Sequence, residues 1–314
     1  FTGATFPLPP KATLTHFCDI NSIAKILMES FSIIGVNCFV LISGYFGIKP
    51  SVKGVVNFIL WCAFYSVVIY AIYAIAKPTQ YNINHFIESF GIFSHTDLWF
   101  IPAYFALYII APIINKGIAD LKAKPFILLL CGLTFINVYL GWGWSHKINP
   151  TGYNVMQLIY IYIIGRFLKV HISRYRNIKH WYIVGYIASF LLIALSTLFC
   201  KSTMAFAYNS PFVISASAFF FLIFTSFRFY SPNINFIASS AFAVYLIHKM
   251  PPIWNDLKNL LIDNTKNADP FTFTLFWVLF IALIFSSCIT IDKFRELVTK
   301  PLSHFITKQI KRII

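Results

Sequence analysis

The chain has 314 residues, of which 58% are hydrophobic and 11% are charged, and its mean hydropathy is +0.72. This balance excludes an ordinary soluble domain. The formal net charge of +15 could indicate a nucleic-acid partner, but the basic residues follow the loops between apolar runs, as described below. The runs are near the roughly 20 residues that cross a bilayer, so the sequence predicts an all-α, polytopic transmembrane helical bundle.

In chain order, the apolar runs predict nine spans. They lie at about 22–47, 52–77, 98–116, 125–141, 153–170, 181–200, 210–229, 235–250 and 271–292. The eighth is short and rests mainly on its apolar run. Residues 82–93 are typical of a short amphipathic segment at the interface. With an external loop at 1–21, the bundle at 22–292 and a basic cytoplasmic tail at 293–314, we expect residues 1–314 to form one membrane domain.

The Lys and Arg residues are concentrated in one set of alternate loops, which holds 17 of the 25. Such an excess marks the cytoplasmic side, so we expect a multi-pass protein of the inner membrane with a cytoplasmic C-terminus and an external Phe1. The basic charge therefore reflects topology, and no nucleic-acid partner is expected. An external start before an odd number of spans favours a chain that lacks a preceding helix, with a cleaved mature chain as the alternative.

The first span contains the stretch GVNCFVLISGYFGIK at 35–49, which is unusually polar and rich in small residues. Asn37, Ser43 and Tyr45 interrupt its apolar run, and Gly35 and Gly44 stand where Ala or Leu would favour a helix. Two interpretations are open. These residues either pack helices closely and form interhelical hydrogen bonds, or they line a working cavity.

Other polar residues near the ends of the spans each have two possible interpretations. His248, with Tyr245 one turn before it, is either a hydrogen-bonded helix-end residue or a group that assists proton transfer. Arg166 either extends its side chain to the lipid headgroups or binds phosphate. The remaining group could hold a sugar or belong to an aromatic interfacial belt; it consists of His95, Asp97 and Trp99.

The six cysteines are scattered without the paired spacing of zinc or redox sites. No Gly-rich phosphate loop, serine nucleophile elbow or zinc-protease helix occurs in the sequence. We therefore expect no metal, and any chemistry has to come from polar residues within the helices.

Three stretches together resemble the integral-membrane acyltransferase-3 family, which includes bacterial O-acetyltransferases of surface polysaccharides and peptidoglycan. They are GVNCFVLISGYF at 35–46, DLWFIPAYFALYIIAPII at 97–114 and AFAVYLIHKM at 241–250. The family usually has ten spans with both ends in the cytoplasm, so nine spans fit a chain without the first. The resemblance implies that the principal catalytic His lies on that helix, upstream of Phe1. A pair of arginines common in the family is also missing, and Lys49 and Lys53 occupy that region.

The resemblance implies a membrane O-acyltransferase that moves acetyl from acyl-CoA to a hydroxyl of a cell-envelope polysaccharide or lipid-linked sugar. Acyl-CoA is the donor substrate, no cofactor is expected to be bound permanently, and the other partners are membrane lipids. Lys49, Lys53 and Arg166 are the candidates for acyl-CoA binding, and His248 is the candidate catalytic residue within this chain. The candidate substrate-binding residues are Asn37, Ser43, Tyr45, His95, Asp97, Trp99 and Tyr245.

The alternative is a transporter or flippase of a glycan or lipid-linked precursor, because such proteins also place polar residues and glycines in their spans. The sequence shows no inverted repeat to support it. Binding of CoA to the solubilised protein would discriminate between the two.

Overall fold

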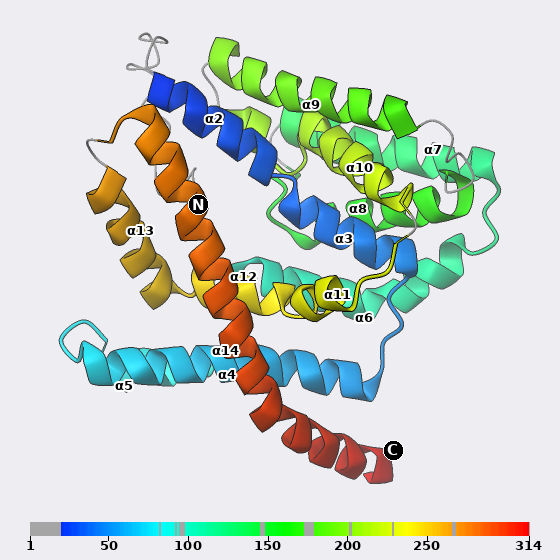
Figure 1. The fold of residues 1–314 in the computed structure, drawn as a ribbon. Coiled ribbons are helices and arrows are strands. Elements are labelled where there is room, and N and C mark those ends of the chain that lie inside the picture. The colour runs from blue at the N-terminus through cyan, green and yellow to red at the C-terminus, as the bar shows by residue number, and fades with distance from the viewer. Residues whose placement is uncertain are drawn as a thin grey trace. The chain divides into compact units, whose positions relative to one another are not determined.

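The computed structural model describes residues 20–81, 83–91, 93, 98–144, 148–172, 179–200, 203–227, 229–265 and 268–313. Within these residues every regular element is a helix and there is no strand, which confirms the all-α prediction (Figure 1). Residues 1–19 of the predicted external loop, His95 and Asp97, and residues 173–178 of the basic 166–179 loop lie outside the described residues.

Among the described residues, eight helical segments are long and apolar enough to cross a membrane, which confirms a polytopic bundle. Each overlaps one of the predicted spans, although the last continues to Arg312, beyond the predicted end at 292. They are Ile23–Phe46, Val52–Ala76, Phe100–Ile118, Ala123–Gly143, Val155–Ile172, His180–Phe199, Thr203–Thr225 and Phe271–Arg312.

The predicted eighth span at 235–250 is not one helix. It is divided between α11 (Pro232–Ala238) and α12 (Ala241–Lys249). At the division, the Ser240 amide donates to the carbonyl of Ile237 at 3.1 Å, and the Ser239 hydroxyl donates to the carbonyl of Phe236 at 2.8 Å. These bonds across three residues tighten and end the first helix. Neither piece alone has the length that a bilayer crossing needs.

The helices group into two compact units. Unit 1 draws its described residues from Phe1–Lys49 and Ala103–Phe229, and unit 2 from Pro50–Pro102 and Tyr230–Ile314. The expected single membrane domain stays a prediction. Unit 1 contains α2 (Ile20–Ser32), α3 (Gly35–Phe46), most of α6 (Phe100–Ile118), α7 (Ala123–Thr134), η2 (Phe135–Gly143), α8 (Val155–Phe167), η3 (Leu168–Ile172), α9 (Lys179–Cys200), η5 (Thr203–Phe206) and α10 (Pro211–Thr225).

In unit 1, α3 packs against both α8 and α10, and α9 packs against α2 and α10 (Figure 1). The α3–α8 pair is close because each helix contributes a glycine to the crossing. A Cβ atom on Gly44 would meet the carbonyl oxygen of Tyr162, and one on Gly165 would lie 2.6 Å from the carbonyl oxygen of Leu41. A Cβ on Gly35 would have nothing within 4 Å. Of the two predicted packing glycines on α3, Gly44 alone is required by close approach.

Unit 2 contains α4 (Val52–Ala76), α5 (Ile83–Glu88), α11, α12, α13 (Pro251–Thr265) and α14 (Pro270–Ile313). The long helix α14 packs against α4 and α12. Residues 293–313, expected as a separate cytoplasmic tail, continue α14 without a break.

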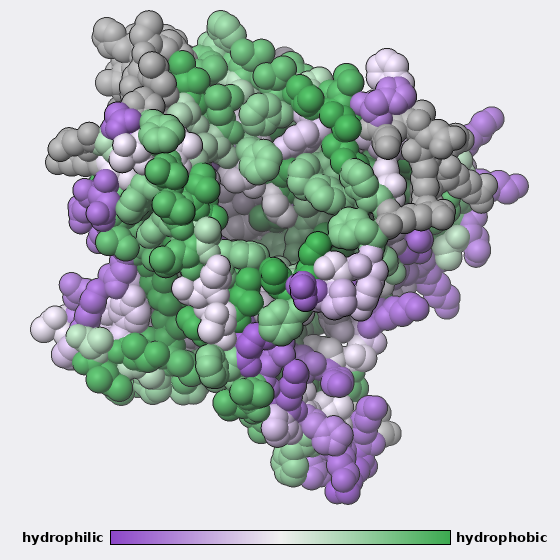
Figure 2. Space-filling model, viewed as in Figure 1, coloured by the Kyte–Doolittle hydropathy of each residue, from purple (hydrophilic) through white to green (hydrophobic). Residues whose placement is uncertain are grey.

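In the C-terminal half of α14, large apolar side chains are exposed and polar side chains are buried. Its exposed positions include large apolar residues, namely Phe294, Leu297, Val298, Leu302 and Phe305. Its buried positions, spaced three or four residues apart, are polar and form what we call the polar seam: Asp292, Arg295, Thr299, Ser303 and Thr307. Hydrophilic residues also gather at the C-terminal end of the helix (Figure 2). The exposed face suits lipid, whereas the inner face needs polar partners.

Candidate functional site

Polar side chains of unit 1 lie along α3 at three levels, beginning with Asn37 near its N-terminus. Asn37 is completely buried, and its Nδ2 donates to the carbonyl oxygen of Tyr208 at 3.0 Å. Gln157, near the start of α8 and also completely buried, donates from Nε2 to the same oxygen at 2.7 Å. Asn37 therefore joins α3 to α8 and to the segment before α10, as an interhelical hydrogen bond would.

Four more amide side chains continue this group, and all six form the amide cluster: Asn37, Asn137, Asn149, Asn154, Gln157 and Asn209. Asn149 donates to Asn137 Oδ1 at 2.9 Å and accepts from Asn154 at 2.8 Å. Asn209 Nδ2 donates to the carbonyl oxygens of Asn137, at 3.1 Å, and of Asn149. Sequence reasoning found only Asn37. Asn149, Asn154 and Asn209 lie in loops, where asparagine is common for local reasons, whereas Gln157 in the first turn of α8 and Asn137 within η2 were missed although they interrupt predicted spans.

The middle level is a pair of hydroxyls. Ser43 Oγ donates to the carbonyl of Phe39 at 3.1 Å and lies 3.0 Å from the hydroxyl of Tyr104 on α6. The Phe39 and Tyr104 rings also contact, with centroids 5.4 Å apart. Ser43 therefore holds the Tyr104 hydroxyl beside α3.

At the C-terminal end of α3, cationic side chains gather around Tyr45 and Gly47. The Lys169 ammonium lies 4.6 Å from the centroid of the Tyr45 ring. Gly47 has φ of +76°, and a Cβ there would come 2.9 Å from Nη1 of Arg166. The Nε of Arg166 is buried without a hydrogen-bond partner, whereas Lys49, two residues beyond Gly47, is exposed. Three cationic side chains of unit 1 thus lie at the C-terminal end of α3 or just after it, namely Lys49, Arg166 and Lys169.

Unit 2 holds the remaining described candidates. On α12, His248 Nδ1 lies 2.5 Å from the carbonyl oxygen of Val244. The carbonyl can only accept, so Nδ1 carries the proton and Nε2 is the basic nitrogen of the neutral ring. The Tyr245 ring contacts both Phe100, at 5.5 Å between centroids, and His248, at 6.3 Å.

Two further candidates in unit 2 are also described. Trp99 contacts Phe100, with centroids 5.8 Å apart, and Lys53 is exposed near the start of α4. The expected grouping of Trp99 with His95 and Asp97 lies largely outside the described residues. It stays a prediction.

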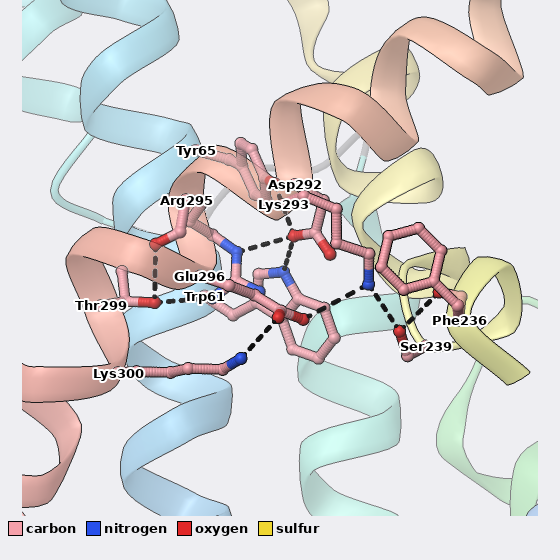
Figure 3. Close-up of polar contacts among 10 residues, drawn as sticks. All are labelled: Trp61, Tyr65, Phe236, Ser239, Asp292, Lys293, Arg295, Glu296, Thr299 and Lys300. Atoms are coloured by element: carbon pink, nitrogen blue, oxygen red, sulfur yellow. Dashed lines mark hydrogen bonds and ion pairs between the residues drawn. The ribbon is translucent and has the colours of Figure 1, made fainter. Parts of the chain in front are cut away.

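Unit 2 also contains a buried charge centre that sequence reasoning missed (Figure 3). Asp292 is completely buried, and its Oδ1 accepts hydrogen bonds from Tyr65 at 2.7 Å, Trp61 at 3.1 Å and Arg295 Nε at 2.7 Å. Arg295 also donates to Thr299 at 2.8 Å. The signal was a charged pair at the end of an apolar run, which in a membrane protein marks a paired or functional group.

Around this centre, the side chains of α14 reach neighbouring elements (Figure 3). The Arg295 guanidinium lies 4.6 Å from the centroid of the Trp61 ring on α4. Lys293 donates to the hydroxyl of Ser239, between α11 and α12, at 2.7 Å. Ser303, one turn beyond Thr299, bonds Asn57 of α4. The polar seam therefore attaches α14 to α4.

The family comparison agrees with the resemblance seen in the sequence. A family profile described as an acyltransferase domain matches residues 11–292. The chain belongs to the acyltransferase-3 family. No curated protein and no solved structure matches it.

This acyltransferase is a multi-pass membrane protein. The described candidate residues fall into two sets, one in each unit. Along α3 in unit 1 lie Asn37, Ser43, Tyr45, Lys49 and Arg166; in unit 2 lie Lys53, Trp99, Tyr245 and His248.

Proposed function

We propose that this acyltransferase moves an acetyl group from acyl-CoA to a hydroxyl of a cell-envelope polysaccharide or a lipid-linked sugar. The observation that carries the proposal is the family match over residues 11–292. In the reaction, the acceptor oxygen attacks the thioester carbonyl, the C–S bond breaks and a C–O bond forms. The acceptor loses its hydroxyl proton, and the CoA thiolate gains one.

The donor end of the site is the C-terminal end of α3. Arg166 has a buried nitrogen without a partner and lies against Gly47, and Lys169 is held over the Tyr45 ring. Guanidinium and ammonium groups bind phosphate oxygens through charge-assisted hydrogen bonds, the former in a bidentate fork. These cations, together with Lys49, would hold the phosphates of acyl-CoA.

From that end, the thioester would reach along α3 toward Asn37. Ten residues separate Asn37 from Gly47, which is about 15 Å along a helix, and an extended pantetheine arm can cover this length. The Ser43 and Tyr104 hydroxyls lie on the way. Each carries a single hydrogen, and Ser43 now donates to Phe39, so the pair would donate to the oxyanion of the thioester carbonyl by giving up one of its present bonds. Within unit 2, His248 is the candidate to take a proton at Nε2, because its Nδ1 already donates to Val244.

The experiment that tests this function uses the full-length protein, purified and transferred into amphipol. Radiolabelled acetyl-CoA is incubated with isolated envelope glycan, and alkali-labile label on the glycan is measured. We expect label to accumulate only with protein present. Movement of a glycan across proteoliposomes without any label transfer would instead identify a transporter.

Arg166→Gln should raise the KM for acetyl-CoA by roughly tenfold with a smaller change in kcat, because a charge-assisted phosphate contact is lost. Lys53→Ala should raise it less, since that side chain is exposed and screened by salt. The measurement is initial rate against acetyl-CoA concentration at low and high salt.

The matched control for the donor variants is Lys124→Ala, which removes an exposed cation at the start of α7 and should leave the KM unchanged. An unchanged KM in Arg166→Gln would return that arginine to lipid-headgroup contact alone.

The proposed orientation has the 166–179 loop in the cytoplasm and the 249–270 segment outside, as the basic residues of the former indicate. Single cysteines at positions 174 and 258 of a cysteine-free variant test it with a membrane-impermeant maleimide on intact cells. Position 258 should be labelled and position 174 should react only after lysis. Labelling of position 174 in intact cells would reverse the orientation, and with it the cytoplasmic C-terminus.

A further inference from the structure

The amide cluster of unit 1 presents buried hydrogen-bond acceptors that nothing in the described protein satisfies. Asn37 Oδ1, Gln157 Oε1 and Asn209 Oδ1 are each buried without a hydrogen-bond partner, although their nitrogens are all bonded. The Ser210 hydroxyl, next to Asn209, is likewise buried and has none. The four side chains are 0% exposed.

The orientation of these amides is fixed by their bonds. Asn37 and Gln157 both donate to the carbonyl oxygen of Tyr208, so rotating either amide by 180° would set its oxygen against that carbonyl oxygen. The same holds for Asn209, whose nitrogen faces two carbonyl oxygens. The oxygens therefore have to be the unsatisfied atoms. The Asn37 and Gln157 amides are neighbours because both bond the Tyr208 carbonyl, and Asn209 is the next residue in the chain after Tyr208.

Leaving this many buried acceptors unsatisfied destabilises the fold, so helix packing alone does not explain the arrangement. Each buried acceptor left without a donor costs about 1–3 kcal/mol, and unsatisfied groups in a native interior call for a specific explanation. Interhelical bonding accounts for the nitrogens of Asn37 and Gln157 but not for their oxygens. A ligand that brings several donors would satisfy them.

The side chains beside the cluster narrow the chemistry of that ligand. The Tyr153 and Tyr208 rings contact each other with centroids 4.9 Å apart, and Tyr153 is 50% exposed. The Glu29 carboxylate, near the end of α2, interacts electrostatically with Tyr153. An exposed aromatic face next to amide acceptors matches a pyranose, whose C–H face stacks on rings while its hydroxyls donate.

We propose that Asn37, Gln157, Asn209 and Ser210 form the acceptor subsite, which binds the hydroxyl groups of a sugar whose ring enters over Tyr153. The inference rests on the proposed function for the reaction, but it assigns these particular residues to the acceptor. The amide oxygens accept from sugar hydroxyls, and the Ser210 hydroxyl can donate or accept. They position the acceptor without exchanging protons themselves.

The test measures sugar binding separately from donor binding. The protein in amphipol, chosen because maltoside detergents carry sugar headgroups, is mixed with methyl β-D-glucoside, methyl β-D-galactoside or methyl N-acetyl-β-D-glucosaminide. Saturation-transfer NMR reports glycoside binding, and the thermal shift with CoA reports the donor site. Gln157→Met and Asn37→Leu remove an acceptor with little change in side-chain size.

We expect at least one glycoside to bind the wild-type protein, and each variant to weaken it roughly three- to tenfold, the effect of one hydrogen bond. The CoA shift should remain. The control Thr197→Val removes a buried hydroxyl that is already bonded to the carbonyl of Ile193, and it should bind the glycoside normally. If Gln157→Met does not fold, Asn37→Leu decides.

Glycoside binding that both variants leave intact would overturn the subsite. The absence of a signal from all three glycosides would also overturn it, because buried water alone would then fill the cluster. Stabilisation of the protein by Na⁺ or K⁺ instead of a glycoside would overturn it as well. A missing CoA shift with normal, variant-sensitive glycoside binding would instead count against the proposed donor and keep the subsite.

Discussion

Gly44→Ala is expected to destabilise unit 1 by about 3 kcal/mol, the upper part of the range for overpacking a close contact. The added Cβ would meet the carbonyl group of Tyr162, which is backbone and cannot rotate away, so α3 and α8 would have to separate. Separation would also move Asn37 relative to Gln157 and Tyr45 relative to Arg166. Because a displacement of about 1 Å costs roughly a hundredfold in rate, acetyl transfer by the folded fraction should fall by that factor.

The matched control is Gly35→Ala on the same helix, where the new Cβ would meet nothing within 4 Å. Its midpoint of thermal unfolding should equal or exceed that of the wild type, since Ala favours a helix by up to about 1 kcal/mol over Gly. Equal midpoints and equal rates for the two variants would show that the α3–α8 crossing is not closely packed.

Arg295→Met is expected to lower the stability of unit 2 by about 3–5 kcal/mol, because it leaves the buried Asp292 carboxylate without its counter-charge. The Trp61 and Tyr65 donors remain, but they carry no charge to offset that of Asp292. Unfolding in mixed micelles with increasing SDS measures the loss.

The control for Arg295→Met is Lys300→Met on the same helix. Lys300 is 72% exposed and pairs with Glu296 at 2.8 Å, and an exposed pair of this kind contributes at most about 1 kcal/mol. The double variant Asp292→Asn with Arg295→Met removes both charges and should recover part of the loss. Similar effects of the two single Met variants would mean that water reaches Asp292.

The sequence indicated the class and most of the spans well, because both depend on local composition. Eight apolar runs were long enough to be unambiguous, and Asn37, Ser43 and Gly44 stood out against an apolar helix. The run at 235–250 was misassigned as one span, since a count of apolar residues does not register a break at Ser239 and Ser240.

What the sequence could not indicate depends on contacts between distant residues. Asn209 and Asn149 are ordinary loop residues until the fold places one against the other across 60 positions. The segment after Asp292 was expected to be a basic cytoplasmic tail because it carries six Lys and Arg residues. Yet its buried residues recur every three or four positions, a helical period that was present in the sequence and pointed to polar partners.

The hydrogen bonds of Asp292 also set an order on the synthesis of the protein. Its partners on α4, Trp61 and Tyr65, precede it by 231 and 227 residues. At roughly 5–20 residues per second, a ribosome needs on the order of 10–45 s to make the intervening chain. During that interval α4 is already available for insertion while the carboxylate that accepts from its indole and phenol does not exist. Unit 2 can therefore close around Asp292 only after α14 is translated.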